Sequence, residues 1–289
     1  MRALMLIYVG LVGACVGSFL NVCITRWPEN LSVIRPRSRC PRCERRIAWY
    51  DNIPVASWLV LRGKCRGCAL PISPLYPVVE LLTAAIFVAS FAWIDDGFVA
   101  FRLAIFATIL LGIAVTDLRT YTIPDGFTVT GFVFVLVTAV IALFAGRDGF
   151  FAGPWQAVLG ACVGAGAIAI VGWLGEVALK KEAMGFGDVT LMAFVGAAVG
   201  PELALLTVFV GAAIGAVTFL AVVLPILALR GRRAPVAPAT TSLPVDPENE
   251  PSGAAPHVPF GVFLAPAAIV TLLYGHEIIG AYLAYVIGA

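Results

Sequence analysis

The stretch from residue 98 to residue 117 reads FVAFRLAIFATILLGIAVTD. Apart from Arg102, it has no charged side chain before its last residue, Asp117. About 20 apolar residues are enough to cross a bilayer as a helix, so we predict a transmembrane helix over 98–116 that ends in a carboxylate at one membrane face. Charged side chains on membrane helices are costly and usually serve function, which makes Asp117 a candidate functional residue.

The rest of the chain repeats this apolar pattern. Hydrophobic residues make up 61% of the 289 residues and charged residues 12%, with a mean hydropathy of +0.97. A soluble domain is only about 45–50% apolar. We predict an all-α polytopic membrane protein with about eight transmembrane helices, over residues 3–22, 78–94, 98–116, 127–145, 155–177, 189–200, 203–229 and 262–287. Small residues recur four apart, which suits close helix packing, at Gly13 and Gly17, Gly160 and Gly164, Gly196 and Gly200, and Gly211 and Gly215.

Basic residues predict the orientation, because Lys and Arg in short loops stay on the cytoplasmic side. Assigning alternate connections to one side places 16 of the 19 Lys and Arg residues there, ten of them in residues 25–76. Only Arg2, Arg102 and Arg147 fall on the other side. We therefore expect the large first loop to be cytoplasmic, the first span to be retained rather than removed as a signal peptide, and both termini to face outward. The net charge of +2 reflects topology, so we expect membrane lipids as partners and no nucleic acid.

Two polar inserts divide the chain. We predict a first transmembrane helix over residues 1–25, a cytoplasmic metal-binding loop domain over 26–76 and a transmembrane core over 77–229. A flexible cytoplasmic linker over 230–258 and a last transmembrane helix over 259–289 complete the chain. The linker is rich in Pro, Ala and Ser and has almost nothing apolar to bury.

The first insert contains two Cys-x2-Cys pairs, separated by 21 residues: Cys40 with Cys43, and Cys65 with Cys68. This separation is just beyond the usual range for a four-cysteine zinc ribbon, but two such pairs still predict a structural zinc site, which would hold together a loop too small to fold on an apolar core. Because four cysteines leave no open position for water, we expect the metal to be structural. The alternative is a redox dithiol, which usually lies beside alternating strands and helices, and that context is missing here.

Three acids lie near the predicted cytoplasmic face. Asp125 follows Pro124 and opens an apolar span, where a helix N-cap explains it. Asp188 also opens a span, but Gly185 and Gly187 flank it and permit close backbone approach. Asp117 ends a helix, where the dipole disfavours a negative charge, so nothing local explains it. We therefore single out Asp117 and Asp188.

A pair of such acids suggests an intramembrane aspartic protease. Two carboxyl groups about 3 Å apart share one proton, so that one acts as base on water while the other polarises the scissile carbonyl. One alternative is an ion-coupled or proton-coupled transporter that uses the same acids, although transport acids tend to lie in mid-span. Another is a non-catalytic membrane scaffold, which explains the cysteines but leaves Asp117 unexplained.

An ordered set of motifs extends through most of the chain. It comprises the two cysteine pairs, the acids described above and Gly17-Ser18-Phe19-Leu20-Asn21-Val22 with Arg26, Asn52-Ile53-Pro54, Gly63-Lys64-Cys65, Tyr76-Pro77 with Glu80, and Pro259-Phe260-Gly261. In these residues the chain resembles the type IV prepilin peptidases. These are the bifunctional leader peptidases and N-methyltransferases of bacterial type IV pilus and type II secretion systems.

The resemblance implies a function and a set of site residues. It makes Asp117 and Asp188 the catalytic pair of an enzyme in the bacterial cytoplasmic (inner) membrane, with its catalytic face cytoplasmic. The implied substrates are prepilins or pseudopilins, each with a basic leader and a hydrophobic helix, cleaved after a glycine. The implied second activity methylates the new N-terminal residue from S-adenosylmethionine, with Gly63 as the residue carried over for that cofactor. Glu80 would line a substrate groove or act as a helix-dipole partner.

Overall fold

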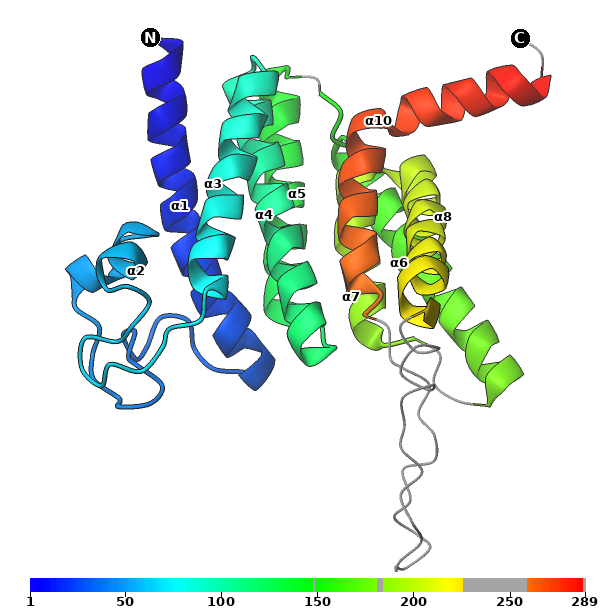
Figure 1. Cartoon of the computed structure of the whole chain (residues 1–289). Coiled ribbons are helices and arrows are strands. Elements are labelled where there is room, and N and C mark those ends of the chain that lie inside the picture. Colours follow the sequence, from blue (N-terminus) through cyan, green and yellow to red (C-terminus); the bar gives the residue numbers. More distant parts are fainter. Residues whose placement is uncertain (148, 181–183, 226–258, 288–289) are drawn as a thin grey trace, which may run out of the picture.

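A computed structural model describes residues 1–147, 149–180, 184–225 and 259–287 (Figure 1). Its helices are α1 (Arg2–Arg26), α2 (Ala56–Val60), α3 (Leu75–Trp93), α4 (Gly97–Thr120), α5 (Asp125–Ala145), α6 (Pro154–Leu179), α7 (Phe186–Val199), α8 (Pro201–Thr218) and α10 (Gly261–Ile287), with short helical turns η1 (Trp27–Glu29), η2 (Trp49–Asn52) and η3 (Phe219–Val223). The predicted linker 230–258 lies outside the described residues.

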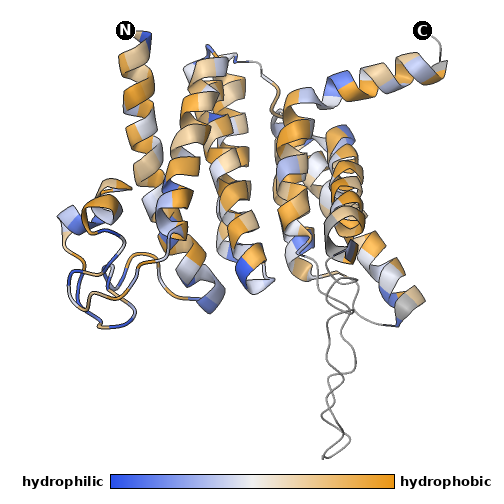
Figure 2. Ribbon diagram, in the orientation of Figure 1, coloured by the Kyte–Doolittle hydropathy of each residue, from blue (hydrophilic) through white to orange (hydrophobic). Residues whose placement is uncertain are grey.

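The all-α prediction is confirmed for the described residues, where the remaining regular pairing is two isolated β-bridges. Seven helices are long and apolar enough to cross a membrane, and α7 is a shorter apolar helix of 14 residues. At 1.5 Å per residue, α7 is about 21 Å long, less than the roughly 30 Å of hydrocarbon. It ends at Gly200, where φ is +86°, and Pro201 then opens α8. Hydrophobic residues cover the outer faces of the helices, as Figure 2 shows.

Helix α4 is the centre of the bundle. In its most apolar segment 61% of the residues are buried, against 22–39% in the other six spans. Its first turn is capped by Asp96, whose Oδ1 accepts N–H groups from Phe98 and Val99 at 2.8 and 3.1 Å. Asp96 also pairs with Arg147 at 2.8 Å, which ties the start of α4 to the end of α5. Asp117 therefore lies at the other end of α4 from Asp96.

Glycines bring neighbouring helices into backbone contact, as their four-residue spacing predicts. Gly160 of α6 and Gly196 of α7 lie so close that a Cβ on either would overlap the carbonyl oxygen of the other. On α1, Gly13 and Gly17 lie against the α3 backbone at Ala84 and Glu80. Close contact between α6 and α7 fixes the position of the N-terminus of α7, where Asp188 lies.

The ends of the helices place the polar segments. The chain between α1 and α3, the α4–α5 turn and the start of α7 all lie at the lower end of the bundle in Figure 1. The start of α10 lies at this end too. Because Asp117 is in the last turn of α4 and Asp188 in the first turn of α7, the fold delivers both acids to one end of the bundle.

Candidate active site and metal centre

Asp117 is buried in the last turn of α4, with only 4% of its surface exposed. Its backbone oxygen accepts the N–H of Tyr121, the left-handed residue that ends the helix. Within the described part of the chain, the side-chain Oδ2 atom is buried and has no hydrogen-bond partner. A buried polar atom without a partner costs free energy, so its retention points to a use in chemistry.

The start of α10 covers this carboxylate. The N–H groups of Gly261 and Val262 point toward Asp117, and a Cβ on Gly261 would be 2.9 Å from Oδ2. The N-terminus of a helix carries a partial positive charge and favours a nearby anion. The dipole of its own helix disfavours a charge on Asp117, whereas the dipole of α10 compensates for it.

Asp188 is the third residue of α7 and is partly buried. Its carboxylate accepts the N–H of Gly185, the residue that precedes the helix, in the manner of a capping box. It also lies near enough to Asp117 for the two charges to repel each other. The structure therefore brings together the two acids that the sequence singles out, although 71 residues separate them in the chain.

Ile123, in the turn between α4 and α5, lies between the two helix starts. A Cβ on Gly187 would be 2.9 Å from Cβ of Ile123, and a Cβ on Gly261 would be 3.0 Å from its Cδ1. Both glycines therefore allow α7 and α10 to approach the same side chain. Ile123 is not predicted from the sequence as a site residue, and the one signal for it is its place in the turn between Asp117 and Asp125.

The predicted N-cap role of Asp125 is wrong. Pro124 is the N-cap residue of α5, and no side chain caps this helix. Asp125 occupies the first helical turn instead, where it is exposed and can interact only with the helix dipole. It does not join the pair formed by Asp117 and Asp188.

The four predicted metal ligands form one cluster. The Sγ atoms of Cys40, Cys43, Cys65 and Cys68 all lie within 4.8 Å of one another, and those of Cys40 and Cys68 are 4.0 Å apart. Sulfurs around a tetrahedral zinc ion with Zn–S of about 2.3 Å would be about 3.8 Å apart. The cluster can therefore bind a metal with little movement.

The two cysteine pairs have the same backbone structure. In the first, the N–H of Cys40 donates to the oxygen of Arg45 and the N–H of Glu44 to the oxygen of Cys40. In the second, Cys65 bonds to Leu70 and Ala69 to Cys65 in the same register. The residue that follows each pair has a positive φ, 55° at Glu44 and 57° at Ala69. Each of the two turns therefore contributes two thiols to the same cluster.

Hydrogen bonds prepare one of these thiols for a cation. The N–H groups of Cys68 and Gly67 lower the pKa of Cys65 to about 6. For Cys68, the N–H of Leu70 lowers the pKa, but burial and the neighbouring thiols outweigh it and raise the pKa to about 11. Among crowded thiols, the first proton is lost readily and the next is held tightly, because adjacent thiolates repel each other. A bound metal ion would neutralise several thiolates at once.

Gly63 and Glu80 lie apart from the acid pair. Gly63 has a φ of +66°, and its missing Cβ leaves room for the indole of Trp58, which a Cβ would meet at 3.0 Å. Glu80 is 8% exposed in the second turn of α3, beyond the first turn that a dipole partner requires. Its Oε2 accepts the N–H of Val55 at 2.7 Å. Glu80 thus anchors the insert to the helical bundle.

Two family models match this chain. The model of the bacterial peptidase A24 N-terminal domain matches residues 11–94, and that of the type IV leader peptidase family matches residues 104–220. The first covers the cysteine insert and the second covers both acids. No solved structure matches.

Three relatives carry the same name. A prepilin leader peptidase/N-methyltransferase of Stutzerimonas stutzeri is 32% identical over 95% of this chain and 92% of its own length. That of Pseudomonas aeruginosa is 31% identical over the same shares. That of Myxococcus xanthus is 42% identical, over 66% of this chain and 55% of its own length. The chain belongs to the peptidase A24 family of prepilin leader peptidase/N-methyltransferases and is a multi-pass membrane enzyme of that class.

Proposed function

We propose that this enzyme cleaves prepilin or pseudopilin leaders with Asp117 and Asp188 as its catalytic pair. The observation that carries the proposal is the placement of these two carboxylates, from α4 and α7, near enough to repel each other at the end of the bundle that bears the basic loops. One of their oxygens is buried without a partner among the described residues. A pair of adjacent acids is the minimum machinery for aspartic proteolysis.

The chemistry follows from one proton shared by two carboxyl groups. The ionised carboxylate takes a proton from water as the water oxygen attacks the scissile carbonyl, and the protonated partner donates a hydrogen bond to the carbonyl oxygen. The carboxyl group that took the proton from water then passes it to the leaving amine as the C–N bond breaks. The N-terminus of α10, directed at Asp117, stabilises the negative charge on the pair throughout.

The basic loops supply the proposed orientation. The segment between α1 and α3, the α4–α5 turn and the start of α7 lie at the same end as the acids (Figure 1). By the positive-inside rule this end is cytoplasmic, in the bacterial inner membrane. A prepilin would enter with its hydrophobic helix in the bilayer and its basic leader at this face, so that the bond after the leader glycine reaches the pair.

The cysteine cluster is proposed to bind structural zinc. Four thiolates from two equivalent turns fit a tetrahedral ion and leave no position for water, so the metal would hold the insert folded without taking part in hydrolysis. Arg66, within the second pair, also donates three hydrogen bonds of 3.2, 2.9 and 2.8 Å to Asp51 and lowers the pKa of that carboxyl. This links the cluster to η2.

The second proposed activity is N-methylation of the new N-terminus, with S-adenosylmethionine supplying the methyl group. It rests on the names of the relatives and on the match at Gly63. The ring of Trp58 lies against the Cβ position of Gly63. We therefore propose that Gly63 affects methyl transfer by shaping the insert around Trp58.

The test is cleavage of a prepilin-like peptide by reconstituted protein. Asp117→Ala and Asp188→Ala should each abolish cleavage, while Asp125→Ala should cleave at the parental rate. Cleavage that survives either of the first two substitutions would refute the pair. Methylation is tested separately on precleaved peptide, where Gly63→Ala should reduce methyl transfer and leave cleavage intact.

A further inference from the structure

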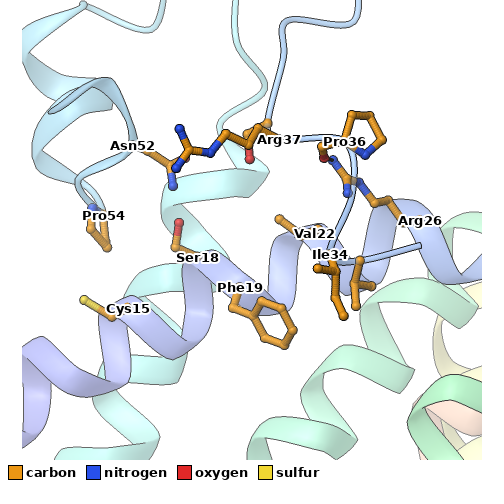
Figure 3. Close-up of a pocket in the computed structure, with 12 residues that line it drawn as sticks. Cys15, Ser18, Phe19, Val22, Arg26, Ile34, Pro36, Arg37, Asn52 and Pro54 are labelled. Atoms are coloured by element: carbon orange, nitrogen blue, oxygen red, sulfur yellow. Dashed lines mark hydrogen bonds between the residues drawn. The ribbon is translucent and has the colours of Figure 1, made fainter. Parts of the chain in front are cut away.

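A cavity of about 360 Å³ lies between α1 and the insert (Figure 3). The loop side contributes Arg37, Asn52 and Pro54, and the α1 side contributes Ser18, Phe19 and Val22. Neither the acid pair nor the cysteine cluster lines it. The proposed cleavage and zinc sites therefore do not account for this cavity.

The cavity carries positive charge. Arg26 and Arg37 both line it and none of its lining residues is acidic, while the Glu80 carboxylate contacts Ser18, so two cations face one anion. Arg26 is held in place because its guanidinium donates to the backbone oxygens of Ser32 and Pro36, at 2.8 Å each. Those carbonyl groups do not neutralise the charge, so the cavity favours an anion. Asn52 adds an amide group that can bind phosphate oxygens.

A shallow apolar face of α1 continues from this cavity. It is formed by Tyr8, Leu11, Val12, Cys15, Val16 and Phe19. Cys15 and Phe19 belong to both the cavity and this apolar face, so the two are continuous. From Tyr8 to Phe19 the helix rises about 16 Å, which matches one leaflet of a hydrocarbon core about 30 Å thick.

The shape and charge of the cavity and the apolar face identify the ligand class. We propose that they bind one anionic phospholipid, with its phosphate beside Arg37 and Arg26 and an acyl chain along α1. Phe19 is 54% exposed on a face of α1 that points away from the bundle, where lipid is the solvent.

The site also depends on a strained turn in the insert. Val55 has φ 60° and ψ −51°, an unfavourable conformation for a β-branched residue, and the N–H of Ala56 bonds back to the oxygen of Pro54. Glu80 of α3 holds this turn through the N–H of Val55. The strain is stored next to Asn52 and Pro54, which line the cavity, as expected where a ligand site must keep its shape.

Lipid retention tests the proposal. The full-length protein is reconstituted with equal amounts of phosphatidylglycerol and phosphatidylcholine of the same acyl chains, and native mass spectrometry measures which lipids stay bound. The parent should prefer phosphatidylglycerol. Arg37→Gln should lower that preference about fivefold, the effect of one interfacial cation. Arg35→Gln, an exposed neighbour outside the cavity, should leave it unchanged.

Two further arms separate lipid from phosphate. Soluble glycerol phosphate should not displace bound lipid, because it lacks the acyl chain. Val12→Trp places a bulky ring on the apolar face of α1, where the acyl chain would lie, and should lower retention of both lipids. The proposal is overturned if Arg35→Gln and Arg37→Gln act equally, if glycerol phosphate displaces the lipid, or if Val12→Trp has no effect. Parental cleavage of a prepilin-like peptide by each variant verifies the fold, and failure of the proposed peptidase would leave lipid retention unaffected.

Discussion

Gly261 lies against the carboxylate of Asp117, so closely that a Cβ at position 261 would be 2.9 Å from Oδ2. The first residue of α10 thus forms part of the environment of an acid on α4, across 144 positions of sequence. This contact brings the positive end of α10 to the acid pair. It also means that the geometry of the pair depends on the last helix of the chain.

Gly261→Ala is therefore expected to impair cleavage. The added methyl group must push α10 or the carboxylate aside, and a displacement of about 1 Å at a catalytic group can reduce the rate by about 10²-fold. The turnover number of reconstituted protein measures the effect. Gly280→Ala is the matched control, because it lies on the same helix with nothing within 4 Å of its Cβ position.

A double variant shows which contact matters. If the clash with Cδ1 of Ile123 were responsible, Ile123→Val would restore activity to Gly261→Ala by removing that atom. We expect no such rescue, because the clash with Asp117 remains. Parental activity of Gly261→Ala alone would mean that α10 does not constrain the pair.

Removal of the Glu80 carboxylate should loosen the insert. In Glu80→Ala, the partly buried N–H of Val55 loses its acceptor, at a cost of about 1.5–3 kcal/mol for a bond to a charged group. Hydrogen exchange at residues 52–56 should accelerate at least tenfold. Glu80→Gln keeps an acceptor oxygen and should stay close to the parent, whereas equal acceleration in both variants would contradict an anchoring role.

Loss of one cysteine ligand should release the metal. Cys65→Ser removes the thiol whose pKa is lowered to about 6, and elemental analysis should find a large drop in zinc per chain. Cys162→Ser, outside the cluster, should retain zinc. Because the acids lie on α4 and α7, outside the insert, cleavage should persist in Cys65→Ser. Full zinc content in that variant would rule out the four-thiolate site.

Helix packing between α6 and α7 is expected to control both stability and activity. Gly160→Ala places a methyl group against the backbone of Gly196, and overpacking of this kind typically costs about 1–3 kcal/mol. Thermal unfolding should shift downward, and cleavage should fall because α7 carries Asp188. Gly166→Ala, on the same helix with open space at its Cβ position, should unfold like the parent. Indistinguishable melting of the two variants would disprove the close contact.

Much of the fold follows from local sequence. Apolar length identifies the helices, and the spacing of Gly160 and Gly164 identifies a close helix contact, because both depend on residues near in the chain. The paired cysteines likewise predict their own cluster. Asp117 stands out because its own helix gives it no partner.

The remaining features depend on residues distant in sequence. The start of α10 lies over Asp117 only because α10 packs beside α4, and no local pattern encodes that contact. Ile123 gains its importance from Gly187 and Gly261, on two other helices. The position of Asp125 in the sequence predicts that it is the N-cap of α5, but the N-cap residue is Pro124. Tertiary packing decides each of these cases.

The most direct measurement is the cleavage rate of single asparagine variants at the acid pair. Asparagine keeps the size of aspartate but can neither share nor transfer the proton, so Asp117→Asn and Asp188→Asn should each lose about 10²–10⁴-fold in turnover, while Asp125→Asn retains the parental rate. Parental turnover in either of the first two variants, with correctly folded protein, would show that the two carboxylates do not act as a catalytic pair.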